Sequence, residues 1–133
     1  MHLSVQNNNI QRQEELVALE DVLKTGDRCL ASGEIGHFCY IDEVFHRMIA
    51  RSTKNPAIIR TYDMTANFMG IARFNGSTLQ NEATLQLEYN ERAQRQHWGI
   101  FEALQKGDVY LAREEMMEHL KLIRFGLGLS DQL

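Results

Sequence analysis

The segment from Ile35 to Ile49 constrains the fold most, because its apolar residues recur at the spacing of one side of a helix. That side consists of Ile35, Phe38, Ile41, Phe45, Met48 and Ile49. Residues three and four positions apart stand on one face of an α-helix. Asp42 and His46 are also one turn apart and fall inside this apolar arc. A buried carboxylate is costly unless it is paired or binds a cation, so this pair predicts polar partners elsewhere in the chain.

The rest of the chain reads as further helices. There is 1 proline in 133 residues, and valine is scarce beside leucine, alanine, glutamate and glutamine, which favours helix over sheet. Five helices are expected, at about residues 10–30, 34–51, 56–73, from between 80 and 87 to 106, and 109–125. Residues 1–9 are expected to be a flexible lead-in, residues 10–126 one domain and residues 127–133 a tail. Short connections between the helices predict an all-α antiparallel helical bundle.

The expected connections carry turn and capping signals. Gly33 suits the end of the first helix, and Gly107 suits the end of the fourth. Asn55 before Pro56 predicts a helix start, with the asparagine as N-cap and the proline at the first helical position. A loop is expected over residues 74–78.

Apolar stripes give each helix an inward face. In the first helix the stripe is Leu16, Val17, Leu19, Val22, Leu23 and Leu30, and in the third it is Ile58, Ile59, Tyr62, Ala66, Met69 and Ala72. The fourth helix has the inward series Ala93, His97, Ile100 and Leu104, and the fifth has Val109, Ala112, Met116, His119 and Ile123.

Two of these inward positions are histidines, and the turn between their helices brings them together. His97 lies ten residues before Gly107, and His119 lies eleven after Asp108. Helices joined by so tight a turn pack antiparallel, so the two imidazoles should sit at nearly the same height. A single inward histidine is usually a hydrogen-bonded core residue. Three inward histidines with an inward aspartate instead fit the ligand chemistry of a divalent metal, with Asp42, His46, His97 and His119 as candidates and His37 in reserve.

Charge and composition exclude several classes of function. The net charge is −4, which argues against a domain that grips nucleic acid by itself. No stretch approaches the ~20 apolar residues of a membrane span, and the N-terminus has no secretion signal pattern. Cys29 and Cys39 form no CxxC motif and are expected to be reduced thiols, so a cytoplasmic location is expected.

Several motifs resemble those of FCD domains, the C-terminal ligand-binding domains of FadR-type regulators in the GntR family. Asp42-Glu43-Val44-Phe45-His46 followed by Ser52-Thr53-Lys54-Asn55 is similar to the family's DxxFHxxI…SxN pattern. The second half, from His97 through Gly107-Asp108 to His119-Leu120, follows its HxxIxxAIxxGDxxxAxxxMxxHL pattern. The resemblance covers about residues 10–125 and implies the FadR C-terminal-domain fold.

The resemblance implies a sensor that binds one divalent metal through one aspartate and three histidines, at Asp42, His46, His97 and His119. Zinc is the first expectation, with nickel, manganese or iron as alternatives. The implied effector is a small carboxylate or sugar acid, and the implied assembly is a homodimer. Five further residues are candidates for effector contact: Arg47, Arg51, Arg60, Arg73 and Asn55.

The sequence also departs from the family. Family members carry a winged helix-turn-helix domain that binds DNA, and an arginine motif at the start of the FCD domain, and neither has a counterpart here. The chain is therefore expected to be a piece of a transcriptional regulator or a shortened stand-alone sensor. A metal-dependent enzyme that activates water is the first alternative, although the nearest extra carboxylate, Glu43, is expected to face solvent. A metal-free helical interaction module is the second.

Overall fold

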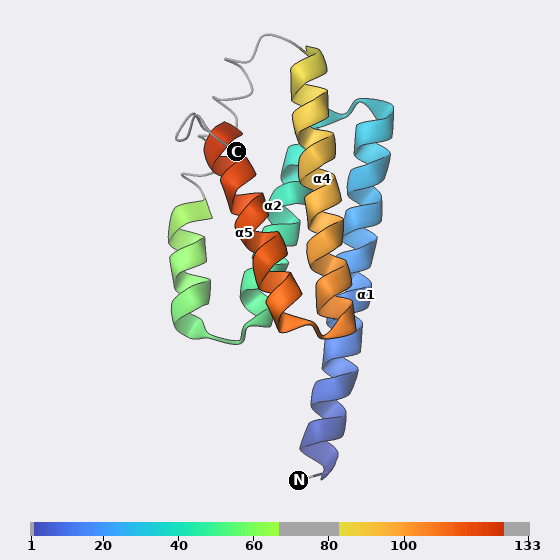
Figure 1. Ribbon diagram of the computed structural model, residues 1–133. Coiled ribbons are helices and arrows are strands. Elements are labelled where there is room, and N and C mark those ends of the chain that lie inside the picture. Colours follow the sequence, from blue (N-terminus) through green and yellow to red (C-terminus); the bar gives the residue numbers. More distant parts are fainter. Residues whose placement is uncertain (1, 67–82, 127–133) are drawn as a thin grey trace.

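The computed structural model describes the backbone of residues 2–66 and 83–126, and side chains within residues 10–66 and 86–124. Four long helices form an antiparallel bundle (Figure 1): α1 (His2–Ser32), α2 (Ile35–Ser52), α4 (Ala83–Lys106) and α5 (Val109–Gly126). A shorter helix over residues 56–66 lies beside the bundle. No strand occurs in the described ranges, so the all-α prediction is confirmed.

The helix boundaries agree with the sequence except at the N-terminus. Helix α1 begins at His2, so the expectation that helix starts only near Ile10 was wrong. The polar residues before Ile10 form a continuation of α1 that projects beyond the α4–α5 turn (Figure 1). The loop expected over 74–78, the end of the helix expected over 56–73, and the tail 127–133 lie outside the described residues.

Two glycine turns make neighbouring helices antiparallel. Gly33 and Gly107 have φ angles of 75° and 71°, a conformation that glycine adopts without steric cost. At the second turn, the Asp108 N–H donates to the Ala103 carbonyl at 3.0 Å and the Gly107 N–H to Leu104 at 3.1 Å. This pair of bonds is a Schellman motif. The Asp108 carboxylate then accepts the Leu111 N–H at 3.0 Å, so one turn ends α4 and starts α5.

Asn55 caps the helix over residues 56–66, as its position before Pro56 predicted. Its Oδ1 accepts the N–H of Ala57 at 3.0 Å and that of Ile58 at 3.4 Å. The side chain therefore satisfies backbone donors that the first helical turn leaves unpaired.

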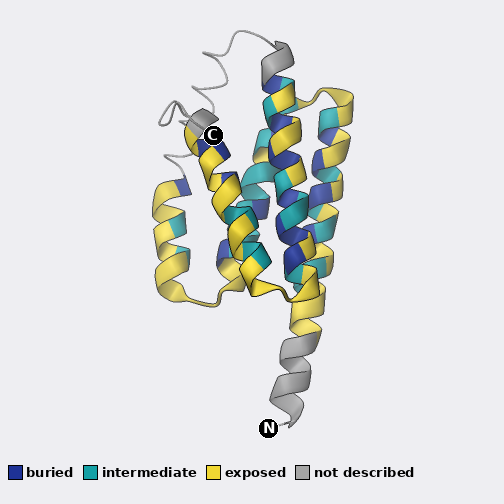
Figure 2. Ribbon diagram, viewed as in Figure 1, coloured by how far each residue is buried: buried dark blue, intermediate teal, exposed yellow. Residues whose placement is uncertain are grey.

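The core lies where α1, α2 and α4 meet, with α5 closing the fourth side. Buried apolar residues of the central cluster are Leu19, Leu23, Phe45, Ile100 and Phe101. Figure 2 shows the buried positions as stripes along the helices, facing inward. Along the described residues, none of the helices combines the length and apolarity needed to cross a lipid bilayer.

Three apolar residues assigned to inward stripes were placed wrongly. Val17 is 58% exposed, Ile58 45% and Val109 78%. Val109 is the first residue of α5, so it extends the periodic series beyond the part of the helix that packs. Val17 stands beside the true stripe of α1, where Leu16, Leu19 and Leu23 pack on the core.

Candidate metal centre

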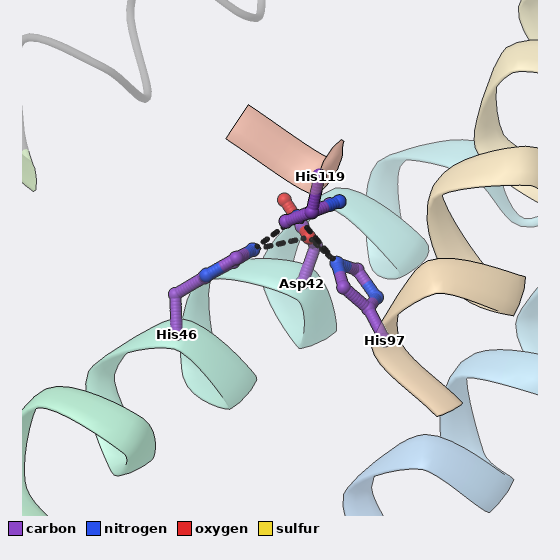
Figure 3. A group of neighbouring side chains, drawn as sticks. All are labelled: Asp42, His46, His97 and His119. Atoms are coloured by element: carbon purple, nitrogen blue, oxygen red, sulfur yellow. Dashed lines mark hydrogen bonds and ion pairs between the residues drawn. The ribbon is translucent and has the colours of Figure 1, made fainter. Parts of the chain in front are cut away.

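Four side chains from three helices converge between α2, α4 and α5 (Figure 3). Asp42 and His46 come from successive turns of α2, His97 from the middle of α4 and His119 from α5. His97 and His119 are 0% and 1% exposed. The four candidates that the sequence brought forward are therefore neighbours in the fold, including the pair that the Gly107 turn was expected to set at one height.

The ligand-type atoms of this Asp42–His46–His97–His119 cluster form a closed ring of short contacts. The Nε2 atom of His97 lies 2.9 Å from Asp42 Oδ1 and 3.1 Å from His119 Nε2. The Nε2 atom of His46 lies 3.3 Å from Asp42 Oδ1 and 3.0 Å from His119 Nε2. All three imidazoles thus present the same nitrogen to one point, and the carboxylate presents an oxygen to it.

Two glutamines of α4 contact the opposite nitrogens of the buried rings. Gln94 Oε1 lies 3.0 Å from His97 Nδ1, and Gln96 Oε1 lies 2.9 Å from His119 Nδ1. An amide oxygen can only accept a hydrogen bond, so each Nδ1 must carry the proton. A neutral imidazole with a proton on Nδ1 has a lone pair on Nε2. Two lone pairs would then face each other across 3.1 Å, an arrangement that a cation between them stabilises.

The distances suit a divalent metal. A metal about 2.1 Å from each nitrogen places neighbouring ligand atoms about 3.0 Å apart when they subtend a right angle, and about 3.4 Å apart in a tetrahedron. The observed contacts of 2.9 to 3.3 Å fall in and near this interval. The residues therefore fit a metal ion, and the nitrogen–nitrogen contacts lie nearer to the right-angled arrangement of a six-coordinate site.

The electrostatics keep the carboxylate ionised. Burial raises the pKa of the Asp42 carboxyl, but when His46 and His97 are protonated, the hydrogen bonds that they donate and their positive charge outweigh that effect. The pKa of Asp42 therefore lies well below its usual range. A carboxylate that stays charged at neutral pH is the form that binds a cation.

Packing fixes the rings from one side. The Phe45 ring lies with its centroid 4.8 Å from that of His97 and 5.5 Å from that of His46, and Phe45 is itself 1% exposed. Asp42 and His46 have side-chain exposures of 14% and 10%. The centre is thus sealed toward the core and less buried on the α2 side.

The other candidates from the sequence lie outside this cluster. Arg47 donates to Glu43 at 2.7 Å within α2, and both side chains are partly exposed. Arg51 and Arg60 are exposed, and Arg73 lies outside the described residues. His37 is more than half exposed and lies 3.5 Å from Glu34. Glu43, expected to face solvent, is instead partly buried in its ion pair with Arg47.

The sequence interpretation missed Gln94 and Gln96. Gln94 precedes His97 by three residues, one turn away on the same inward face, and it is 4% exposed. A glutamine in an apolar arc, one turn before a candidate ligand, was the signal that could have found it. Gln96 stands next to His97 in sequence but contacts His119 on the neighbouring helix, and no spacing within α4 indicates that.

Comparisons with known proteins support the same reading of the chain. The FCD domain family matches residues 9–122. The "Uncharacterized HTH-type transcriptional regulator YcbG" of Bacillus subtilis (strain 168) is 32% identical over 115 residues, which cover 84% of this chain and 42% of that protein. The chain therefore spans less than half the length of this relative. No solved structure matches the chain.

Proposed function

The chain belongs to the FCD domain family, and on that premise we propose that it is a metal-dependent sensing domain for a small carboxylate. Asp42, His46, His97 and His119 would hold one divalent ion. The domain would serve a transcriptional regulator of the helix-turn-helix type, as the name of its relative suggests.

One observation carries this proposal: three Nε2 atoms and one ionised carboxylate oxygen meet at a single point. Gln94 and Gln96 accept hydrogen bonds from the far sides of two rings, so the near sides would present Nε2 lone pairs to a cation. Neutral imidazoles and a carboxylate are common ligands of zinc, nickel, manganese and iron. Zinc is the first candidate, and the nitrogen–nitrogen distances near 3.0 Å also suit the six-coordinate alternatives.

The coordination positions that the protein ligands leave unfilled on a bound metal suggest the kind of effector. Four protein ligands do not fill a six-coordinate ion, so a bound metal would supply one or two positions for an effector oxygen. The less buried α2 edge, at Asp42 and His46, is the side from which an acid could reach it. The Phe45 ring, which lies against His46 and His97, would then favour acids with short or apolar backbones.

A sensor fits the site better than an enzyme. Hydrolysis of a substrate by metal-bound water needs a general base beside the ligands. The nearest candidate from the sequence, Glu43, is held by Arg47. Effector binding would instead shift the populations of helix arrangements, and in a longer protein, proposed to be a homodimer, this shift would reach the DNA-binding domain.

Calorimetric titration with a panel of dicarboxylates and hydroxy acids tests the proposal. Metal-loaded protein should bind at least one acid, and protein stripped with chelator should bind none until metal is restored. The His119→Ala variant serves as a second metal-poor sample. If an acid bound equally well to the stripped protein, the metal would not be the anchor, and Arg47 or Arg51 would become the better candidates.

A further inference from the structure

Gln94 is fixed from the side opposite to His97 by helix α1. Its Nε2 donates to the Leu23 carbonyl at 2.8 Å and to Asp27 Oδ1 at 2.9 Å. Both of these oxygens can only accept hydrogen bonds. The amide nitrogen must therefore face α1, and the amide oxygen must face His97 Nδ1, 3.0 Å away.

A glycine near the C-terminal end of α1, Gly26, makes room for this amide. A Cβ atom at Gly26 would lie 3.3 Å from Gln94 Oε1 and only 2.9 Å from Gln94 Nε2, and the second distance is shorter than such atoms approach in proteins. Glycine within a helix is destabilising relative to alanine. The close approach of the Gln94 amide explains why a glycine nevertheless stands at position 26. The indole N–H of Trp98 donates to both oxygens of Asp27, at 3.2 and 3.1 Å. This contact fixes the Asp27 carboxylate, which in turn accepts the hydrogen bond from Gln94.

Two acceptors compete for the proton of a neutral His97 ring. Asp42 Oδ1 lies 2.9 Å from Nε2 and Gln94 Oε1 lies 3.0 Å from Nδ1. With the proton on Nε2 the ring is bonded to Asp42 and cannot bind a metal. With the proton on Nδ1 the Nε2 lone pair faces the metal centre.

We propose that Gln94, anchored on α1 by Gly26, Leu23 and Asp27, is a positioning residue that keeps His97 in its metal-binding tautomer. The inference rests on the metal function proposed above, and it adds that a buried amide couples α1 to the metal centre. A displacement of α1 relative to α4 would then change the state of His97. Helix α1 is also the element whose N-terminal end projects from the bundle (Figure 1).

The first test observes the tautomer directly in metal-free protein. Proton–nitrogen correlation spectra of protein with ¹⁵N-labelled histidine are recorded at about pH 8, above the ordinary histidine pKa of about 6.5. The His97 signals are identified by their loss in His97→Gln. Wild type should show His97 protonated on Nδ1, and Gln94→Leu should show the proton on Nε2. An unchanged tautomer in Gln94→Leu would overturn the proposal.

The second test measures zinc affinity by competition with a chromophoric chelator. Gln94→Leu should weaken zinc binding by about 10- to 100-fold, the usual effect of removing a hydrogen-bond partner of a ligand. Gln105→Leu, the same change at an exposed position of α4, should bind zinc as wild type does. Equal zinc affinities for Gln94→Leu and Gln105→Leu would contradict the proposal.

Two variants of α1 test the same proposal if the Gln94→Leu protein does not fold. Asp27 is exposed, so Asp27→Ala should fold and shift the His97 proton partly toward Nε2. Gly26→Ala should do the same by displacing the amide. If neither variant changed the tautomer, the coupling to α1 would be wrong. Because the spectra need no metal, wild-type protein without zinc affinity would refute the metal function alone.

Discussion

His97 and His119, on antiparallel helices joined by one glycine turn, face each other with their Nε2 atoms 3.1 Å apart. Each ring is bonded through its other nitrogen to a glutamine of α4. The fold thus brings two nitrogens with lone pairs into contact and holds an ionised Asp42 beside them.

Removing one buried imidazole should abolish most metal binding and lower stability. His119→Ala deletes a ligand that contacts both His46 and His97. A metal bound only by the folded state stabilises it by about 2.7 kcal/mol when the free metal is 100 times its Kd. At that metal concentration, thermal unfolding should show this metal-dependent stabilisation in wild type and not in His119→Ala. His37→Ala, which changes an exposed histidine, is the control, and equal metal-dependent shifts in both variants would contradict the assignment.

Metal affinity should fall as the pH is lowered from about 7.5 to about 5.5. Free imidazole takes up a proton near pH 6.5, and a protonated ring nitrogen cannot bind a metal. The pKa of Asp42 lies well below its usual range, so the carboxylate stays charged over this interval and the loss comes from the histidines. Zinc affinity measured by chelator competition at each pH checks this. A flat profile would mean that imidazoles are not the ligands.

The core of α1 should be far less tolerant of truncation than its outer face. Leu19 is 3% exposed and belongs to the central cluster, whereas Val17 is 58% exposed. Leu19→Ala should lower the free energy of unfolding by about 2 to 5 kcal/mol. Val17→Ala should change it by no more than about 0.5 kcal/mol. Urea denaturation of both variants measures the difference, and similar losses would show that the buried stripe of α1 is misplaced.

Local spacing was sufficient to predict each of the two residue pairs of the metal centre, but not that the two pairs meet. The Gly107-Asp108 turn forces α4 and α5 to pack antiparallel, and counting residues from it sets His97 level with His119. The i, i+4 spacing likewise puts Asp42 and His46 on one face of α2. We inferred that the two pairs meet from the cost of burying unpaired polar side chains and from the family resemblance. No sequence spacing connects α2 to α4.

The features that spacing missed depend on contacts between helices. Gln94 is buried because its amide bonds to α1, and the helical pattern of α4 alone gives a glutamine no such partner. The start of α1 was misplaced because the polar residues near the N-terminus resemble a loop in sequence. This part of α1 projects from the bundle, so it needs no apolar stripe. Val109 was placed inward by extending a period past the end of the packed region.

The metal content of the purified protein tests the central claim most directly. Protein prepared without exposure to chelators, and dialysed against zinc, should contain close to one divalent ion per chain by elemental analysis. The His97→Ala variant, treated in the same way, should contain much less, and His37→Ala as much as wild type. Wild-type protein with no more metal than His97→Ala would contradict the account.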